Sequence, residues 1–112
     1  MNRTIRRGEI WWVSLDPSRG SEIRKTRPCV VVSVDEVNQA RRTPVVVPLS
    51  ASPADAPPIV VSVPSAGSDS VAVVDQIRAV DKGRFVDTSG SLSAQDLSVV
   101  ESALRSILAL PE

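Results

Sequence analysis

Short runs of apolar residues, rich in valine, alternate along this chain with polar segments rich in proline, glycine and serine. β-branched side chains pack well on a pleated sheet, and runs of this length bounded by turn-forming residues are typical of strands. The pattern therefore predicts six strands, over residues 10–15, 28–34, 45–49, 59–63, 71–80 and 85–87.

The run 71–80 predicts the longest of these strands. Its first half is apolar throughout, and its second half alternates between apolar and polar side chains. Successive residues of a strand point to opposite faces of the sheet. We therefore expect Gln76 and Arg78 to share one face and Ile77 and Ala79 to share the other.

Two other strands carry residues that restrict their placement. Pro48 lies inside the run 45–49, and because proline has no N–H to donate it indicates an edge strand or a bulge. Trp11 and Trp12 are adjacent, so they should point to opposite faces of the first strand, with one of them in the core.

Only the end of the chain has helical periodicity. Ser93 and Asp96 match an N-terminal capping pattern, with aspartate in place of the commoner glutamate. The apolar residues that follow fall on one stripe, comprising Leu97, Val100, Leu104, Ile107 and Leu108.

Asp35 is expected to cap a single helical turn over 35–40. Many short strands with one terminal helix predict a mainly β fold, a small barrel.

Composition narrows the possible functions. A chain of 112 residues predicts one domain, and a single cysteine excludes an internal disulfide. Cys29 lies in an apolar run and is expected to be a small core residue. The chain has no histidine, which excludes a histidine triad or a histidine metal site, and we expect neither metal nor cofactor. No membrane-spanning stretch or signal peptide is visible, so the expected compartment is the cytoplasm.

The net charge of zero conceals an asymmetry. Residues 1–27 contain seven basic and three acidic side chains, or +4, and the other residues contain six basic and ten acidic, or −4. Three of the cations, Arg24, Lys25 and Arg27, directly precede Pro28 at the start of the second strand. Pro28 favours an extended conformation for Arg27 and so holds it at the mouth of the strand. A guanidinium fixed in this way suits an anionic ligand such as a phosphate.

Four segments in series resemble the MazF/PemK toxin family. They are residues 8–13 (GEIWWV), 27–33 (RPCVVVS), 47–50 (VPLS) and 75–84 (DQIRAVDKGR). The resemblance spans nearly the whole chain and implies a single toxin domain over 1–112, with the SH3-like barrel of the CcdB/PemK-like fold. It also implies a sequence-specific, metal-independent and ribosome-independent endoribonuclease of single-stranded RNA. The implied partners are a second copy of the chain in a homodimer and a cognate MazE-like antitoxin.

The resemblance matches the family's catalytic residues to Arg27 and Ser50, with serine where many members have threonine. In such enzymes the RNA 2′-OH attacks the adjacent phosphorus, which yields a 2′,3′-cyclic phosphate and a 5′-OH. Arg27 would stabilise the charge that develops on the phosphorane, and Ser50 would donate to a phosphate oxygen.

Five further residues are expected to bind RNA or to support the site, namely Glu22, Arg24, Lys25, Gln76 and Arg78. Glu22 is a candidate general base, although contact with RNA or with the dimer partner is the preferred interpretation. Arg24 and Lys25 would attract the phosphate backbone. The tryptophan outside the core is expected to lie at the dimer interface rather than to stack on a base.

Two alternatives come from other functional classes. One is a CcdB-like toxin that poisons gyrase with the same barrel, and it would leave RNA intact. The other is a non-catalytic SH3-like binding module. Such modules need aromatic grooves, whereas this chain has no tyrosine and only three aromatic residues.

Overall fold

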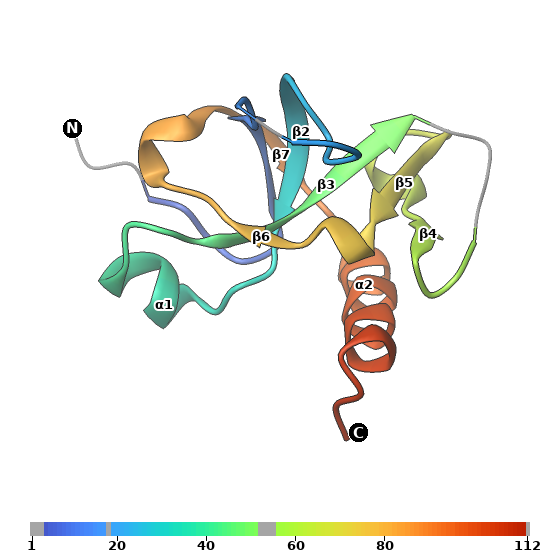
Figure 1. The fold of residues 1–112 in the computed structure, drawn as a ribbon. Helices are drawn as coiled ribbons and strands as arrows, with labels where there is room; N and C mark the ends of the chain where they lie inside the picture. Colours follow the sequence, from blue (N-terminus) through green and yellow to red (C-terminus); the bar gives the residue numbers. More distant parts are fainter. Residues whose placement is uncertain (1–3, 18, 52–55, 112) are drawn as a thin grey trace.

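A computed structural model describes residues 4–17, 19–51 and 56–111. Seven antiparallel strands form one sheet in the order β4-β5-β3-β2-β1-β7, with β6 paired to β3 off this path (Figure 1). The strands are β1 (Glu9–Ser14), β2 (Thr26–Val31), β3 (Val45–Ala51), β4 (Val60–Ser62), β5 (Ser70–Val73), β6 (Arg78–Ala79) and β7 (Phe85–Ser91). The helices are α1 (Asp35–Ala40) and α2 (Ala94–Ile107), and the short 3₁₀ turns are η1 (Pro64–Ala66), η2 (Val74–Gln76) and η3 (Lys82–Arg84).

The sheet is open. Its edge strands, β4 and β7, do not pair with each other within the described ranges. The prediction of a mainly β fold with a terminal helix and a short helical turn is therefore confirmed, but the sheet does not close into a barrel. None of the helices in these ranges has the length and apolar character that crossing a bilayer requires.

The central strands are buried on both faces, which explains their continuous apolar runs. On one face α2 covers a helix-side cluster that includes Ile10, Val30, Val47, Leu49, Val74 and Val100. On the other face lies a loop-side cluster of Ile5, Trp11, Val13, Leu15, Cys29, Val31, Val46, Val80 and Phe85. Neighbouring residues of β1, β2 and β3 alternate between the two clusters. Cys29 is buried, as predicted.

The two tryptophans follow the same alternation. Trp11 is 4% exposed, and its ring meets that of Phe85 edge-on with centroids 5.7 Å apart. Trp12 is 41% exposed on the opposite face. Trp11 is therefore the core residue of the pair.

Helix α2 begins as predicted and ends at Ile107. The Ser93 side chain accepts a hydrogen bond from the Asp96 N–H (3.1 Å). The Asp96 carboxylate does not close a reciprocal box, because it accepts from the Ser65 N–H of η1 (2.7 Å). Leu108 follows the helix and is 51% exposed, so its predicted place in the buried stripe is wrong.

Helix α1 forms where predicted, but Asp35 does not cap it. The N-cap is Val34, and no side chain caps the helix. Asp35 is the first helical residue, and its carboxylate accepts the Arg7 N–H (2.7 Å). The side chain thus ties the N-terminal segment to α1 instead of satisfying the helix itself.

The predicted strand over 71–80 is wrong, because η2 divides it into β5 and β6. Leu49 of β3 pairs with Ala72, and that register would bring Asp75 opposite Val46. Val46 instead pairs with Arg78, three residues later. The three extra residues form η2. Gln76 therefore lies in this turn and Arg78 in β6, so the two residues do not share one face of a single strand.

The change of register also accommodates Pro48. Strand β3 pairs with β6 at residues 45–46 and with β5 at residues 49–51. Pro48 lies between these stretches, where its missing N–H is tolerated. Of the two predicted alternatives, the edge strand is wrong because β3 is interior. An irregularity is present, but it lies in the segment between β5 and β6 rather than in β3 itself.

Candidate active site

Arg27 lies at the exposed end of β2. The strand begins at Thr26, two residues before the predicted start, because Thr26 and Arg27 pair with Ser14 and Val13 of β1. Pairing with β3 begins only at Cys29. Arg27 is therefore held in a strand on one side while its side chain stays exposed, and its Nε donates to the Arg24 carbonyl (3.4 Å).

Ser50 lies at the matching position of β3. Cys29 pairs with Pro48 in the antiparallel register. Arg27 lies two residues before Cys29, and Ser50 lies two residues after Pro48. Paired residues share a face, and so do alternate residues of one strand. Arg27 and Ser50 therefore point to the same face as Cys29, that of the loop-side cluster, from neighbouring strands. Ser50 is half-buried and pairs on its other side with Val71 of β5.

The loop between β1 and β2 leads into this position. Lys25 has a left-handed backbone (φ 71°), a conformation that non-glycine residues adopt rarely and at a cost in free energy. The Leu15 N–H donates to the Lys25 carbonyl (2.9 Å), which closes the base of the loop. Arg24 and Lys25 are both exposed beside Arg27.

Glu22 lies further out in the same loop. Its carboxylate accepts the Arg19 N–H (2.6 Å), and its own N–H donates to the Arg19 carbonyl (3.0 Å). The side chain is exposed and stabilises a turn of the loop.

Arg78 and Gln76 occupy different settings. Arg78 pairs with Val46 of the loop-side cluster, so it shares the face of Arg27 and Ser50. Burial raises the pKa of the Cys29 thiol to about 12, and the Arg78 charge opposes that shift, which indicates that Arg78 lies near Cys29. Gln76 lies in η2, which packs against α2 and β3. The fold thus brings Arg78 to the face of Arg27 and leaves Gln76 in a separate turn.

A hollow of about 470 Å³ lies on the opposite, helix-side face. Trp12 and Pro28, which pair across β1 and β2, form part of its wall. The other lining residues are Ile10, Leu49, Ser65, Ala66, Ser70, Ser89, Gly90 and Ser91. None of these described lining residues carries a charge, and none is a predicted catalytic residue.

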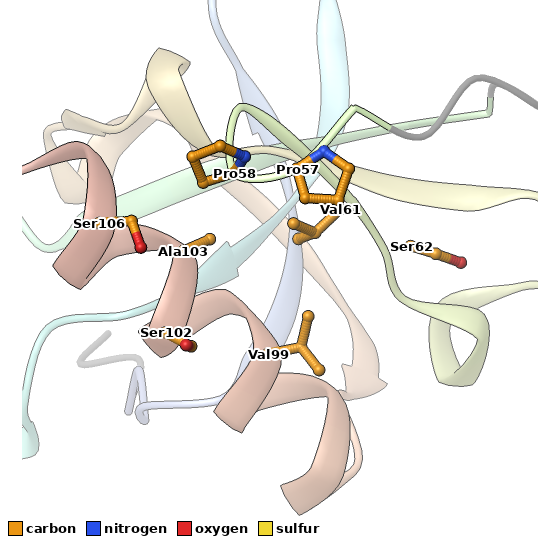
Figure 2. A pocket seen from close by; sticks show the side chains of 8 residues that line it. All are labelled: Pro57, Pro58, Val61, Ser62, Val99, Ser102, Ala103 and Ser106. Carbon is orange, nitrogen blue, oxygen red and sulfur yellow. The ribbon is translucent and has the colours of Figure 1, made fainter.

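A second hollow, of about 370 Å³, lies beside α2. Figure 2 shows Pro57, Pro58 and Val61 on one side of it and Val99 and Ala103 of α2 on the other. This hollow is also formed without charged side chains among the described residues. The segment that joins β3 to this hollow lies partly outside the described residues, at 52–55.

Sequence reasoning missed Arg84. It lies in η3, where the Asp81 side chain accepts the Gly83 N–H (2.7 Å). The Arg84 guanidinium reaches back to the end of β1, where Nη1 donates to the carbonyls of Ser14 (3.3 Å) and Asp16.

The arrangement of Arg27 and Ser50 suits a phosphate group. A guanidinium offers a planar fork of donors, and a hydroxyl can donate to another oxygen of the same group. Both come from strands whose central residues are buried, so their backbones are held by the core. The resulting face is accessible and cationic, with Arg78 on the same side.

Comparison with known proteins identifies relatives along most of the chain. A sequence model of the family described as "PemK-like, MazF-like toxin of type II toxin-antitoxin system" matches residues 6–108. Endoribonuclease MazF9 of Mycobacterium tuberculosis is 38% identical over 110 residues, covering 90% of this chain and 93% of the relative.

Solved structures share the fold. MazF from Deinococcus radiodurans superposes with a TM-score of 0.84 at 24% identity, covering 96% of this chain and 99% of that one. An endoribonuclease from a mycobacterial species, in complex with its cognate antitoxin, has a TM-score of 0.80 at 22% identity, covering 96% and 98%.

Proposed function

Because the chain belongs to the PemK-like, MazF-like toxin family of type II toxin–antitoxin systems, we propose that it is a toxin endoribonuclease. It cuts single-stranded RNA in the cytoplasm at a short sequence, without the ribosome, and residues 1–112 act as one toxin domain. The observation that carries this proposal is the alignment of Arg27 with Ser50 on one face of β2 and β3. The similarity to endoribonuclease MazF9 supports it independently.

The proposed reaction uses a nucleophile that the RNA itself supplies. The 2′ oxygen forms a bond to the adjacent phosphorus, and the bond from phosphorus to the 5′ oxygen breaks. The 2′-OH proton passes to a base, and the departing oxygen gains a proton. The products are a 2′,3′-cyclic phosphate and a 5′-OH end. Because the nucleophile is already in the substrate, alignment and charge stabilisation are enough, and no metal is required.

Arg27 and Ser50 divide the stabilisation between them. The Arg27 guanidinium neutralises the charge that develops on the phosphorane oxygens, and proton donation to the leaving oxygen is its secondary role. A protonated guanidinium has no free acceptor site, so Arg27 is unsuitable as a proton acceptor. Ser50 donates to a phosphate oxygen and fixes its orientation. We assign no proton acceptor.

The surrounding residues support substrate binding. Arg24 and Lys25 are exposed beside Arg27 and attract the phosphate backbone. Arg78 adds positive charge on the same face. Gln76, in η2, is assigned to supporting the site. Glu22 is exposed in the same loop and is assigned to contact with RNA or the dimer partner. One of its oxygens already accepts the Arg19 N–H.

Two protein partners complete the proposal. The first is a MazE-like antitoxin, supported by the structural relatives solved with an antitoxin. An acidic segment of such a partner would complement the exposed cations of the β1–β2 loop. The second is another copy of this chain, and the exposed indole of Trp12 is a suitable anchor for that interface.

The experiment is cleavage of a long RNA by purified protein in the presence of EDTA, followed by chemical identification of the ends. We expect cuts at one short sequence that leave 2′,3′-cyclic phosphate and 5′-OH ends. Cleavage that needs added magnesium would contradict the mechanism. RNA that stays intact while gyrase is trapped on DNA would favour a gyrase poison instead.

A further inference from the structure

Arg84 holds the base of the loop that leads into the candidate active site. The loop leaves β1 after Ser14 and returns at Thr26. Nη1 of Arg84 donates to the carbonyls of both Ser14 and Asp16, the last residue of β1 and the second residue beyond it. A single guanidinium from a distant turn thus fixes the direction in which the loop leaves the sheet.

The opposite side of the loop base is tied to the same point. Leu15, between the two acceptors of Arg84, donates its N–H to the Lys25 carbonyl (2.9 Å) and is itself fully buried. Lys25 has φ 71°, which turns the chain just before β2. The carbonyl of Arg24, the residue before this turn, accepts a hydrogen bond from Nε of Arg27 (3.4 Å). These hydrogen bonds, joined through the backbone of Lys25, link Arg84 to the loop base and the loop base to the Arg27 side chain.

The turn that carries Arg84 is itself anchored. The Asp81 carboxylate accepts the Gly83 N–H (2.7 Å) and a guanidinium hydrogen of Arg42 (3.3 Å). The Lys82 N–H donates to the Arg42 carbonyl (2.7 Å), and Phe85 directly after Arg84 is in the loop-side cluster. These contacts give Arg84 a fixed backbone from which to reach the loop.

We propose that Arg84 is a positioning residue for the endoribonuclease site, which orients Arg27 by fixing the base of the β1–β2 loop. This inference rests on the proposed function. We assign Arg84 to positioning rather than to phosphate binding, because Nη1 is engaged by two backbone carbonyls and the side chain is half-buried. Loss of the contact should displace Arg27, and a displacement of about 1 Å at a reacting centre can cost on the order of 100-fold in rate.

The test compares Arg84→Ala and Arg84→Lys with the wild-type protein, using steady-state cleavage of a short RNA at several salt concentrations. Arg105→Ala, which removes an exposed charge from α2, is the matched control. We expect Arg84→Ala to lower kcat by about 10- to 100-fold with KM within about threefold. Arg84→Lys, which keeps a donor, should retain an intermediate kcat, and it carries the comparison if the alanine variant does not fold.

Two readouts separate positioning from other roles. A lost phosphate contact would reduce the slope of log KM against log salt by about 0.7, whereas a lost positioning contact leaves it unchanged. In RNA-free protein, hydrogen exchange at the Leu15 amide should accelerate in Arg84→Ala at temperatures where the global fold is intact. Unchanged kcat, unchanged exchange, or a reduced salt slope would each overturn the inference. Wild-type protein that leaves RNA intact would instead overturn the proposed function, and the exchange comparison would still decide whether Arg84 holds the loop.

Discussion

Arg27 and Ser50 occupy matching positions on the neighbouring strands β2 and β3, two residues past the paired Cys29 and Pro48. They share the loop-side face, while Pro28 and Leu49 beside them point to the hollow on the other face. The arrangement follows from strand alternation and one register, so a substitution at either position should leave the sheet intact. The two side chains can therefore be tested separately from the fold.

Replacing Ser50 with alanine should slow cleavage without unfolding the protein. Removal of one donor to a developing oxyanion typically raises the barrier by about 2.7–4 kcal/mol, or about 100- to 1000-fold in rate. Single-turnover cleavage of a short RNA measures the effect. Ser50→Thr keeps the hydroxyl and should remain within about tenfold of the wild-type rate.

A serine outside the site provides the control for this substitution. Ser62→Ala removes an exposed hydroxyl from β4 and should cleave at the wild-type rate. Equal rates for Ser50→Ala and Ser62→Ala would remove Ser50 from the mechanism.

A single 2′-deoxynucleotide on the 5′ side of the cleaved phosphate should abolish cleavage at that position. The substitution removes the nucleophile but keeps the phosphate charge, so binding should change by less than about threefold. Cleavage and binding of matched RNA oligonucleotides measure the two effects. Continued cutting at the deoxy position would show that water or another nucleophile attacks the phosphorus.

Ionisation of Cys29 should make stability depend on alkaline pH. Burial raises the thiol pKa from 9.0 to about 12, so the unfolded chain releases this proton at lower pH than the folded protein. The stability that the protonated thiol contributes is complete below pH 9 and is lost between pH 9 and about 12, at about 1.4 kcal/mol per pH unit. Urea unfolding at pH 8 and pH 10.5 should show a larger loss for wild-type protein than for Cys29→Ala. Equal losses would contradict the assignment.

Gly8 should be intolerant of a side chain. Its φ is +90°, and an added Cβ would lie 3.4 Å from Cδ2 of Leu97. Its N–H and carbonyl also bond to Val31 (2.7 Å) and Leu92 (2.9 Å), so the backbone cannot relax freely. Gly8→Ala should lower the free energy of unfolding by about 1–3 kcal/mol in urea titrations. Gly20→Ala, with φ +57° and nothing within 4 Å of the added Cβ, should cost less.

Local sequence patterns correctly predicted those features of the fold that depend only on residues close together in the chain. Alternation separated Trp11 from Trp12, the apolar run around Cys29 predicted its burial, and Ser93 predicted the start of α2. Each of these features depends on neighbours in the chain or on one face of one strand.

The errors arose where distant segments decide the structure. The three extra residues of η2 follow from β3 pairing with β5 at one end and β6 at the other, which the pattern of residues 71–80 cannot reveal. Asp35 and Asp96 bind the backbone of Arg7 and Ser65, so neither completes the local cap expected of it. The contact of Arg84 with Asp16 spans 68 residues and leaves no local signal.

The most direct test of the account is the cleavage rate of Arg27→Ala. Arg27 is exposed and Val13, its partner in β1, is held by the core, so the variant should keep the wild-type circular dichroism spectrum and melting temperature. The account predicts at least about a 100-fold slower single-turnover cleavage of RNA, with loss of growth arrest on expression. A folded Arg27→Ala protein that cleaves RNA and arrests growth at the wild-type rate would contradict it.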